Sequence, residues 1–136
     1  MLLLSHRLVV RFRDCDALGH VNNAVYLTYL EQARFTLWKA QLGRRPGQDR
    51  APGIIMARVE IDYRSQVRYG DELEVRVMLD AVGRTSFTYA YEVIDTLDGR
   101  VVAQAKTVQV HFDYERNTPV VIDDELRARI STPVAR

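Results

Sequence analysis

The chain has 136 residues, and its 19 Lys and Arg residues nearly balance its 18 Asp and Glu residues, for a formal net charge of +1. This length predicts one domain, residues 1–136, with enough core to fold without a disulfide or a metal. The near-neutral charge argues against a protein that binds nucleic acid through a strong overall field. A single cysteine excludes an intrachain disulfide and a cysteine-cluster metal site. No apolar run approaches the roughly 20 residues of a membrane span, so we expect a cytoplasmic protein without a membrane partner.

The N-terminal part of the sequence predicts one strand, a polar loop and one long helix. Residues 7–13 show the alternation of a strand near their end. A helix is expected from Asn22 or Asn23 to about Leu42, with Asn22 as N-cap and Gly43 as C-terminal stop. Its buried face consists of apolar residues spaced 4, 3 and 4 positions apart, namely Tyr26, Leu30, Ala33 and Leu37.

The rest of the sequence predicts strands and a short charged helix. After a loop at residues 43–53, alternating apolar side chains indicate strands up to about residue 113. Turns are expected at Tyr69-Gly70-Asp71, at Val82-Gly83-Arg84 and at Asp98-Gly99. Residues 123–130 have a helical pattern. Neighbouring strands in succession favour an α+β fold, in which the antiparallel sheet wraps the single long helix.

The loop before the helix has the composition of an acyl-transfer site. Asp16 lies just before a glycine turn and a helix N-terminus, where unpaired backbone N–H groups carry a partial positive charge. A carbonyl held there would be polarised as in an oxyanion hole, and the carboxylate could attack it or activate a water. Gly19 allows a sharp turn and the close approach of a ligand to the backbone.

This segment resembles the hot-dog-fold thioesterases, specifically the 4-hydroxybenzoyl-CoA and acyl-CoA thioesterase group. The resemblance rests on Asp14-Cys15-Asp16-x-x-Gly19-His20-Val21-Asn22-Asn23, Tyr26-Leu27 and Glu31-x-Ala33-Arg34, and later on Asp62-Tyr63, Tyr69-Gly70-Asp71 and Gly83-Arg84-Thr85-Ser86-Phe87. It implies one long helix wrapped by a five- or six-stranded antiparallel sheet. It also implies a homodimer as the minimal unit, active sites at the dimer interface, and tetramers of two dimers.

The resemblance also implies roles for particular residues. Asp16 takes the position of the catalytic carboxylate, as nucleophile or general base, and the backbone N–H of Asn23 takes the position that polarises the thioester carbonyl. Arg84, Thr85 and Ser86 occupy the segment that binds the nucleotide end of coenzyme A, and Arg84 can grip a phosphate bidentately. The implied activity is hydrolysis of an acyl-CoA to a carboxylic acid and free CoA. No metal or cofactor is expected, because coenzyme A is part of the substrate.

Other reactive residues have simpler interpretations. We expect Asp14 to pair with Arg11 or Arg13, and Glu31 to pair with Arg34 or another arginine, with a second catalytic carboxylate at Glu31 as the alternative. Cys15 is expected to be a small buried residue. The three histidines, His6, His20 and His111, have no metal-ligand spacing.

Two other functions remain open from the sequence. The first is a thioesterase acting on an acyl-carrier protein, which uses the same chemistry with a protein partner. The second is a hot-dog module that binds acyl-CoA without hydrolysing it. A hot-dog dehydratase is disfavoured, because no histidine lies at the helix start where one would be needed.

Overall fold

The computed structural model describes residues 1–43 and 53–134. The elements in chain order are β1 (Leu2–Val9), the 3-10 turn η1 (Phe12–Asp14), α1 (Val25–Leu42), β2 (Gly53–Tyr63), β3 (Glu72–Val82), β4 (Ser86–Asp95), β5 (Val101–Asp113), β6 (Thr118–Pro119) and α2 (Asp124–Ile130). A strand, one long helix and an antiparallel meander follow one another, which confirms the predicted α+β class. The loop expected at residues 43–53 falls largely outside the described residues.

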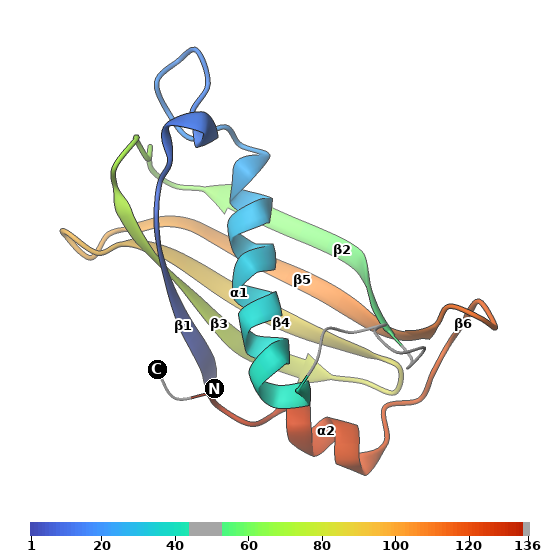
Figure 1. Ribbon diagram of the computed structural model, residues 1–136. Helices are drawn as coiled ribbons and strands as arrows, with labels where there is room; N and C mark the ends of the chain where they lie inside the picture. Colours follow the sequence, from blue (N-terminus) through green and yellow to red (C-terminus); the bar gives the residue numbers. More distant parts are fainter. Residues whose placement is uncertain (44–52, 135–136) are drawn as a thin grey trace.

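The sheet is antiparallel and wraps α1 on one face (Figure 1). Its strand order is β1-β3-β4-β5-β2, and the short β6 pairs with β5. The side chains of β3 and β4 that point toward α1 are buried, and they are Leu73, Val75, Val77, Phe87, Tyr89, Tyr91 and Val93. The core therefore lies between α1 and the sheet, and α1 spans the molecule from one end of the strands to the other.

The apolar face of α1 was predicted correctly, but the start of the helix was not. Leu30, Ala33 and Leu37 are each 0% exposed, and Gly43 ends the helix with φ 75°. The helix begins at Val25, and the capping residue is Ala24 rather than Asn22. Asn22 instead forms a turn before the helix, because its Oδ1 accepts a 2.9 Å hydrogen bond from the Ala24 N–H.

The first strand also differs from its prediction. It runs over Leu2–Val9 and not over residues 7–13, and it pairs with β3 from Leu2↔Met78 to Val9↔Glu72. Buried Leu3 and Leu4 explain the earlier start. The later residues leave the sheet because Asp14 closes a short 3-10 turn, in which its carboxylate accepts from the Arg11 N–H at 3.0 Å.

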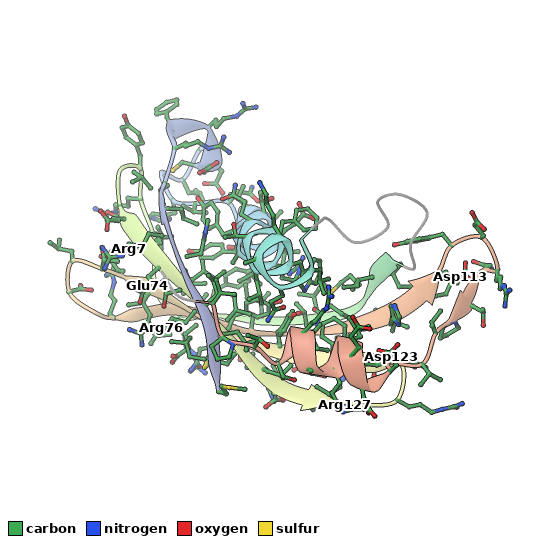
Figure 2. All side chains as sticks on the ribbon, turned by 60° about the horizontal axis from the view of Figure 1, so that its bottom comes forward. Arg7, Glu74, Arg76, Asp113, Asp123 and Arg127 are labelled. Atoms are coloured by element: carbon green, nitrogen blue, oxygen red, sulfur yellow. The ribbon has the colours of Figure 1, made fainter. Side chains whose placement is uncertain are left out.

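The turns between the later strands match their predictions. Gly70 and Gly99 have φ values of 86° and 76°, which explains why glycine occupies these tight turns. On the side of the sheet away from α1, charged side chains pair across β1 and β3. Arg76 Nε lies 2.9 Å from Glu74, and Arg7 reaches the same carboxylate at 3.9 Å (Figure 2).

Candidate active site

Asp16 lies at the tip of a small hairpin between η1 and α1. Cys15 and Val21 form an antiparallel bridge, and the Asp16 N–H donates to the His20 carbonyl at 3.0 Å. Gly19 closes the turn with φ 81°, and its N–H donates to the Asp16 carbonyl at 3.0 Å. The hairpin leaves the Asp16 side chain exposed to solvent, with Oδ1 accepting a 3.0 Å hydrogen bond from the Leu18 N–H. Its carboxylate is accessible to a ligand.

The hairpin leads directly into the N-terminus of α1. The N–H groups of Ala24 and Val25 are bonded to Asn22, through its side chain and its carbonyl respectively, each at 2.9 Å. The Asn23 N–H has no hydrogen-bond partner among the described residues, and Asn23 is exposed. An unpaired N–H at a helix start can donate to a carbonyl oxygen that gains negative charge.

A pocket of about 260 Å³ lies beside Asn23. It is lined by residues of the hairpin, the start of α1, the end of β2 and the segment after it, namely His20, Val21, Asn23, Tyr26, Tyr63, Arg64, Ser65, Gln66 and Val67. The rings of Tyr26 and Tyr63 meet edge to face at 5.1 Å, and the Tyr63 hydroxyl donates to the Asn23 carbonyl at 2.8 Å. Burial, and next the nearby Tyr63, raises the pKa of Tyr26 to about 12. Both hydroxyls therefore remain protonated at neutral pH.

Asp14 is the buried carboxylate of the hairpin. It is 2% exposed and binds Arg11, as predicted, with Arg11 Nη2 at 3.0 Å from Oδ1. The Tyr29 hydroxyl donates to Asp14 Oδ2 at 2.8 Å. Burial alone would raise the pKa of Asp14, but the hydrogen bonds from Arg11 and Tyr29 outweigh it and hold this pKa below its ordinary value. Asp14 is thus an ionised, fully engaged carboxylate, in contrast to the exposed Asp16.

The predicted coenzyme A residues lie at the other end of the molecule. Arg84 and Thr85 form the turn between β3 and β4, and Ser86 begins β4, which spans roughly 30 Å at 3.3 Å per residue. In Figure 1 this turn lies near the C-terminal end of α1, and the Asp16 hairpin lies beyond its N-terminal end. A single chain therefore does not bring Arg84 and Asp16 together.

The Arg84 turn is attached to the segment around α2. The Ile122 N–H donates to the Arg84 carbonyl at 2.8 Å, and Arg127 Nη2 donates to the Gly83 carbonyl at 3.2 Å. Asp123, labelled with Arg127 in Figure 2, caps α2 by accepting from the Leu126 N–H at 2.8 Å. The Arg84 side chain is exposed and has no ion-pair partner in the part of the chain that the structure describes. It is free to contact an anion.

A second hollow of about 250 Å³ lies between α1 and β2. Glu31 and Arg34 both line it, but within residues 1–43 and 53–134 they form no ion pair, so the pairing expected for Glu31 is absent there. Arg34 is 7% exposed and instead donates to the Tyr91 hydroxyl at 3.3 Å, which in turn bonds to Thr107. Glu31 remains an exposed carboxylate near the middle of α1.

The remaining predictions concern cysteine, metals and membranes. Cys15 is half-buried, and its Sγ lies 4.0 Å from the Arg11 carbonyl. In the described ranges, no three side chains of the metal-binding types cluster together. The described helices include none that is long and apolar enough to cross a membrane.

Two contacts of the site were missed by sequence reasoning. Tyr29 lies three residues after Tyr26, so the helical period could have placed it on the buried face. Its contact with Asp14 spans 15 positions, and the contact of Tyr63 with Asn23 spans 40. No local pattern signals either pairing.

The sequence matches the thioesterase-like superfamily over residues 10–130. A 1,4-dihydroxy-2-naphthoyl-CoA hydrolase of Synechococcus elongatus is 33% identical over 106 residues, which cover 75% of this chain and 76% of that protein. The long-chain acyl-CoA thioesterase FadM of Escherichia coli is 25% identical over 131 residues, covering 96% of this chain and 99% of that protein.

Solved structures show the same fold. The PA2801 protein of Pseudomonas aeruginosa superposes with a TM-score of 0.87 at 25% identity, covering 96% of this chain and 99% of that one. A 1,4-dihydroxy-2-naphthoyl-CoA thioesterase from Synechocystis superposes with a TM-score of 0.83 at 17% identity, covering 93% of each chain. The match over most of the chain and these likenesses show that the protein belongs to the thioesterase-like superfamily, as a thioester hydrolase with the hot-dog fold.

Proposed function

We propose that the protein is an acyl-CoA thioesterase in which Asp16 and the Asn23 N–H form the catalytic centre. One observation carries the proposal: an exposed carboxylate sits on the hairpin that leads directly into a helix start with an unpaired N–H. The named activities of the two relatives above, both on acyl-CoA thioesters, support this substrate class.

The Asn23 N–H and the Asp16 carboxylate have different tasks in the proposed reaction. The Asn23 N–H donates to the thioester oxygen and stabilises the negative charge that it gains when the carbonyl carbon is attacked. Asp16 either removes a proton from the attacking water or attacks the carbonyl itself and is released by water. In both routes the C–S bond breaks, the water oxygen ends in the carboxylic acid, and the departing CoA sulfur takes up a proton. Gly19, which has no side chain, leaves the hairpin open to the substrate.

The coenzyme A subsite in this proposal comes from a second subunit. Arg84, Thr85 and Ser86 of one chain lie too far from its own Asp16 to hold the nucleotide of the same substrate molecule. A two-fold axis beside β2 would pair two β2 strands antiparallel. The Tyr63 end of one strand would then lie beside the Gly53 end of the other. This arrangement brings the β3–β4 turn of the partner to the same end as Asp16.

The exposed edge of β2 supports this homodimer. β2 is the last strand of the sheet order, and it is 11 residues long. Met56, Val59 and Tyr63 are each more than a third exposed on it. A long, apolar edge strand invites pairing with another chain, and symmetric pairing with a second copy removes the exposed edge.

The resemblance to the family also implies that two dimers assemble into a tetramer. The sheet face opposite α1 carries a hollow of about 460 Å³ and is uncovered by either described helix, so two dimers have a surface through which to form a tetramer. The proposal needs no metal or redox cofactor, because the carboxylate and the backbone N–H supply the chemistry. The single cysteine is compatible with the reducing conditions of the cytoplasm, where we place the enzyme.

Replacement of Asp16 tests the function directly. The change Asp16→Asn keeps the size of the side chain but removes the negative charge, so release of free thiol from benzoyl-, short-chain and long-chain acyl-CoA should stop. The folded state and the oligomer should persist, because the hydrogen bonds that Asp16 makes with described residues all lie within its own exposed hairpin. Undiminished hydrolysis in this variant would refute the mechanism.

Asp80→Asn is the matched control. Asp80 is an exposed aspartate on β3, and its only ion pair with a described residue is with Lys106 at 3.4 Å, so its replacement should leave hydrolysis unchanged. Parallel assays with the same acyl group on CoA and on an acyl-carrier protein measure kcat/KM for each carrier. Binding of acyl-CoA without turnover across the whole panel would favour a non-hydrolytic module.

A further inference from the structure

We propose that Asp14 is a positioning residue, which together with Tyr29 and Arg11 clamps the Asp16 hairpin against α1. The inference rests on the proposed function, because it assigns the clamp to the reaction that Asp16 performs. Asp14 does not itself touch the substrate in this assignment. It is 2% exposed, whereas Asp16, two residues later, is open to solvent.

The helix side of the clamp is Tyr29. This residue is 2% exposed and lies in the second turn of α1, close to the helix end that carries the unpaired N–H. Its hydroxyl donates to Asp14 Oδ2 at 2.8 Å. Burial, followed by the nearby Asp14 carboxylate, raises the pKa of Tyr29, so the hydroxyl keeps its proton and remains a donor. The bond joins the hairpin to the helix across 15 positions of sequence.

The loop side of the clamp consists of backbone and side-chain bonds at both ends of the hairpin. Arg11 donates twice to the Asp14 carboxylate, from its N–H and from Nη2, each at 3.0 Å. At the other end, the Asn22 N–H donates to the Asp14 carbonyl at 2.9 Å. Asp14 thus fixes the residues before and after the hairpin relative to one another and to α1.

The hydrogen bonds that Asp14 accepts distinguish its role from that of Asp16. Both oxygens of Asp14 accept hydrogen bonds from the protein, so it has little capacity left to act as a base. Within residues 1–43 and 53–134, the Asp16 carboxylate accepts a hydrogen bond only from the Leu18 N–H of its own turn. Because a displacement of about 1 Å of a catalytic group can reduce the rate roughly 100-fold, a clamp two residues from Asp16 can determine the rate without contacting the substrate.

Variants that remove single bonds of the clamp test this role. Tyr29→Phe removes the hydroxyl but keeps the buried ring, and Asp14→Asn keeps an acceptor for Tyr29 but removes the charge facing Arg11. We expect Tyr29→Phe to lower kcat about tenfold or more and to leave KM within about twofold, since the misplaced group acts in the reaction and not in binding. The double variant should lose less than the two single losses combined, because Tyr29 and Arg11 bind the same Asp14 carboxylate and the two changes act on one network.

Tyr89→Phe is the matched control for loss of a buried hydroxyl. Tyr89 is 0% exposed and accepts the Trp38 Nε1–H at 2.8 Å in the core, away from the hairpin. This variant should unfold at a lower denaturant concentration and keep the kcat of the unmodified protein. Amide hydrogen exchange across residues 15–23 should be faster in Tyr29→Phe than in Tyr89→Phe, which reports on the hairpin independently of turnover.

The outcomes separate the clamp from the proposed function. Unchanged kcat in both Tyr29→Phe and Asp14→Asn, or an equal loss of kcat in Tyr89→Phe, would overturn the clamp while the unmodified protein still hydrolysed thioesters. A change in KM alone would also overturn it. If the unmodified protein hydrolysed no thioester, the proposed function would fail, and with it the catalytic role of the clamp.

Discussion

The hydroxyl of Tyr63 donates a 2.8 Å hydrogen bond to the carbonyl oxygen of Asn23. This bond joins the end of β2 to the residue whose N–H is unpaired at the start of α1. The edge-to-face contact of Tyr63 with Tyr26 supports the same junction. The position of the Asn23 N–H is therefore set by the sheet as well as by the helix, and the proposed oxyanion donor is sensitive to a residue of β2.

Tyr63→Phe should reduce catalysis more than stability. Loss of a partly exposed hydrogen bond costs about 1 kcal/mol of folding free energy, whereas loosening an oxyanion donor is expected to lower kcat by roughly 10-fold. Burial raises the pKa of Tyr63, so the hydroxyl is a protonated donor at neutral pH and the loss should not depend on pH there. Steady-state hydrolysis and denaturant unfolding measure the two effects.

Tyr114→Phe is the corresponding control. The Tyr114 hydroxyl donates to the Ile54 carbonyl at 3.2 Å, so it makes the same kind of bond to the opposite end of β2. Its removal should affect stability to a similar extent and leave kcat unchanged. Equal kcat values for the two variants would show that the Tyr63 bond has no part in the reaction.

Arg84→Ala should weaken binding of the nucleotide end of coenzyme A. We expect KM for acyl-CoA to rise about 10-fold with little change in kcat, because a charge-assisted bond to phosphate lies far from the reacting carbonyl. The same acyl group on pantetheine, which lacks the nucleotide, should give equal KM values for variant and unmodified protein. An unchanged KM for acyl-CoA would remove Arg84 from the subsite.

The sequence was sufficient for the features that depend on local periodicity. The buried face of α1 repeats every three or four residues, and buried Leu73, Val75 and Val77 of β3 alternate with more exposed residues, so both elements could be located from side-chain pattern. The start of α1 was misplaced because Asn22 is also a good turn residue, and its side chain bonds to Ala24 before the helix begins. Local pattern cannot distinguish these two uses of asparagine.

Only the part of the site formed by residues close together in the sequence could be predicted. Asp16, Gly19 and Asn23 are close in sequence, and the hairpin brings them to one end of α1. The contacts of Tyr29 and Tyr63 depend on how the sheet is positioned over the helix, which no local pattern specifies. The distance between Arg84 and Asp16 likewise follows from strand order, and it is the reason that the proposed site needs two subunits.

Acid should remove the stability that Asp14 provides. Its folded-state pKa lies below the ordinary value of 3.8, so ionised Asp14 stabilises the folded state fully above that value. The contribution is lost as the pH falls through the folded-state pKa. Asp14→Asn should lower the free energy of unfolding by about 1.5–3 kcal/mol at neutral pH, as expected for hydrogen bonds to a charged group. The difference from the unmodified protein should shrink below pH 3.8.

Asp80→Asn again provides the comparison for this pH series. Asp80 is exposed and, in the part of the chain that the structure describes, pairs only with Lys106, so its replacement should change the free energy of unfolding by less than about 0.5 kcal/mol at any pH. Denaturant titrations at several pH values measure both variants. A difference between Asp14→Asn and the unmodified protein that stayed constant into acid would contradict the lowered pKa of Asp14.

Mixed dimers test whether the two halves of the site come from different subunits. In a heterodimer of an Asp16→Asn chain and an Arg84→Ala chain, one site combines the intact Asp16 of the second chain with the intact Arg84 of the first. The other site carries both defects. Two different affinity tags isolate this heterodimer, and at low acyl-CoA concentration its activity should approach half that of the unmodified dimer. If each site were contained in one chain, every site of the heterodimer would carry one defect. Its activity would then equal the mean of the two variant homodimers.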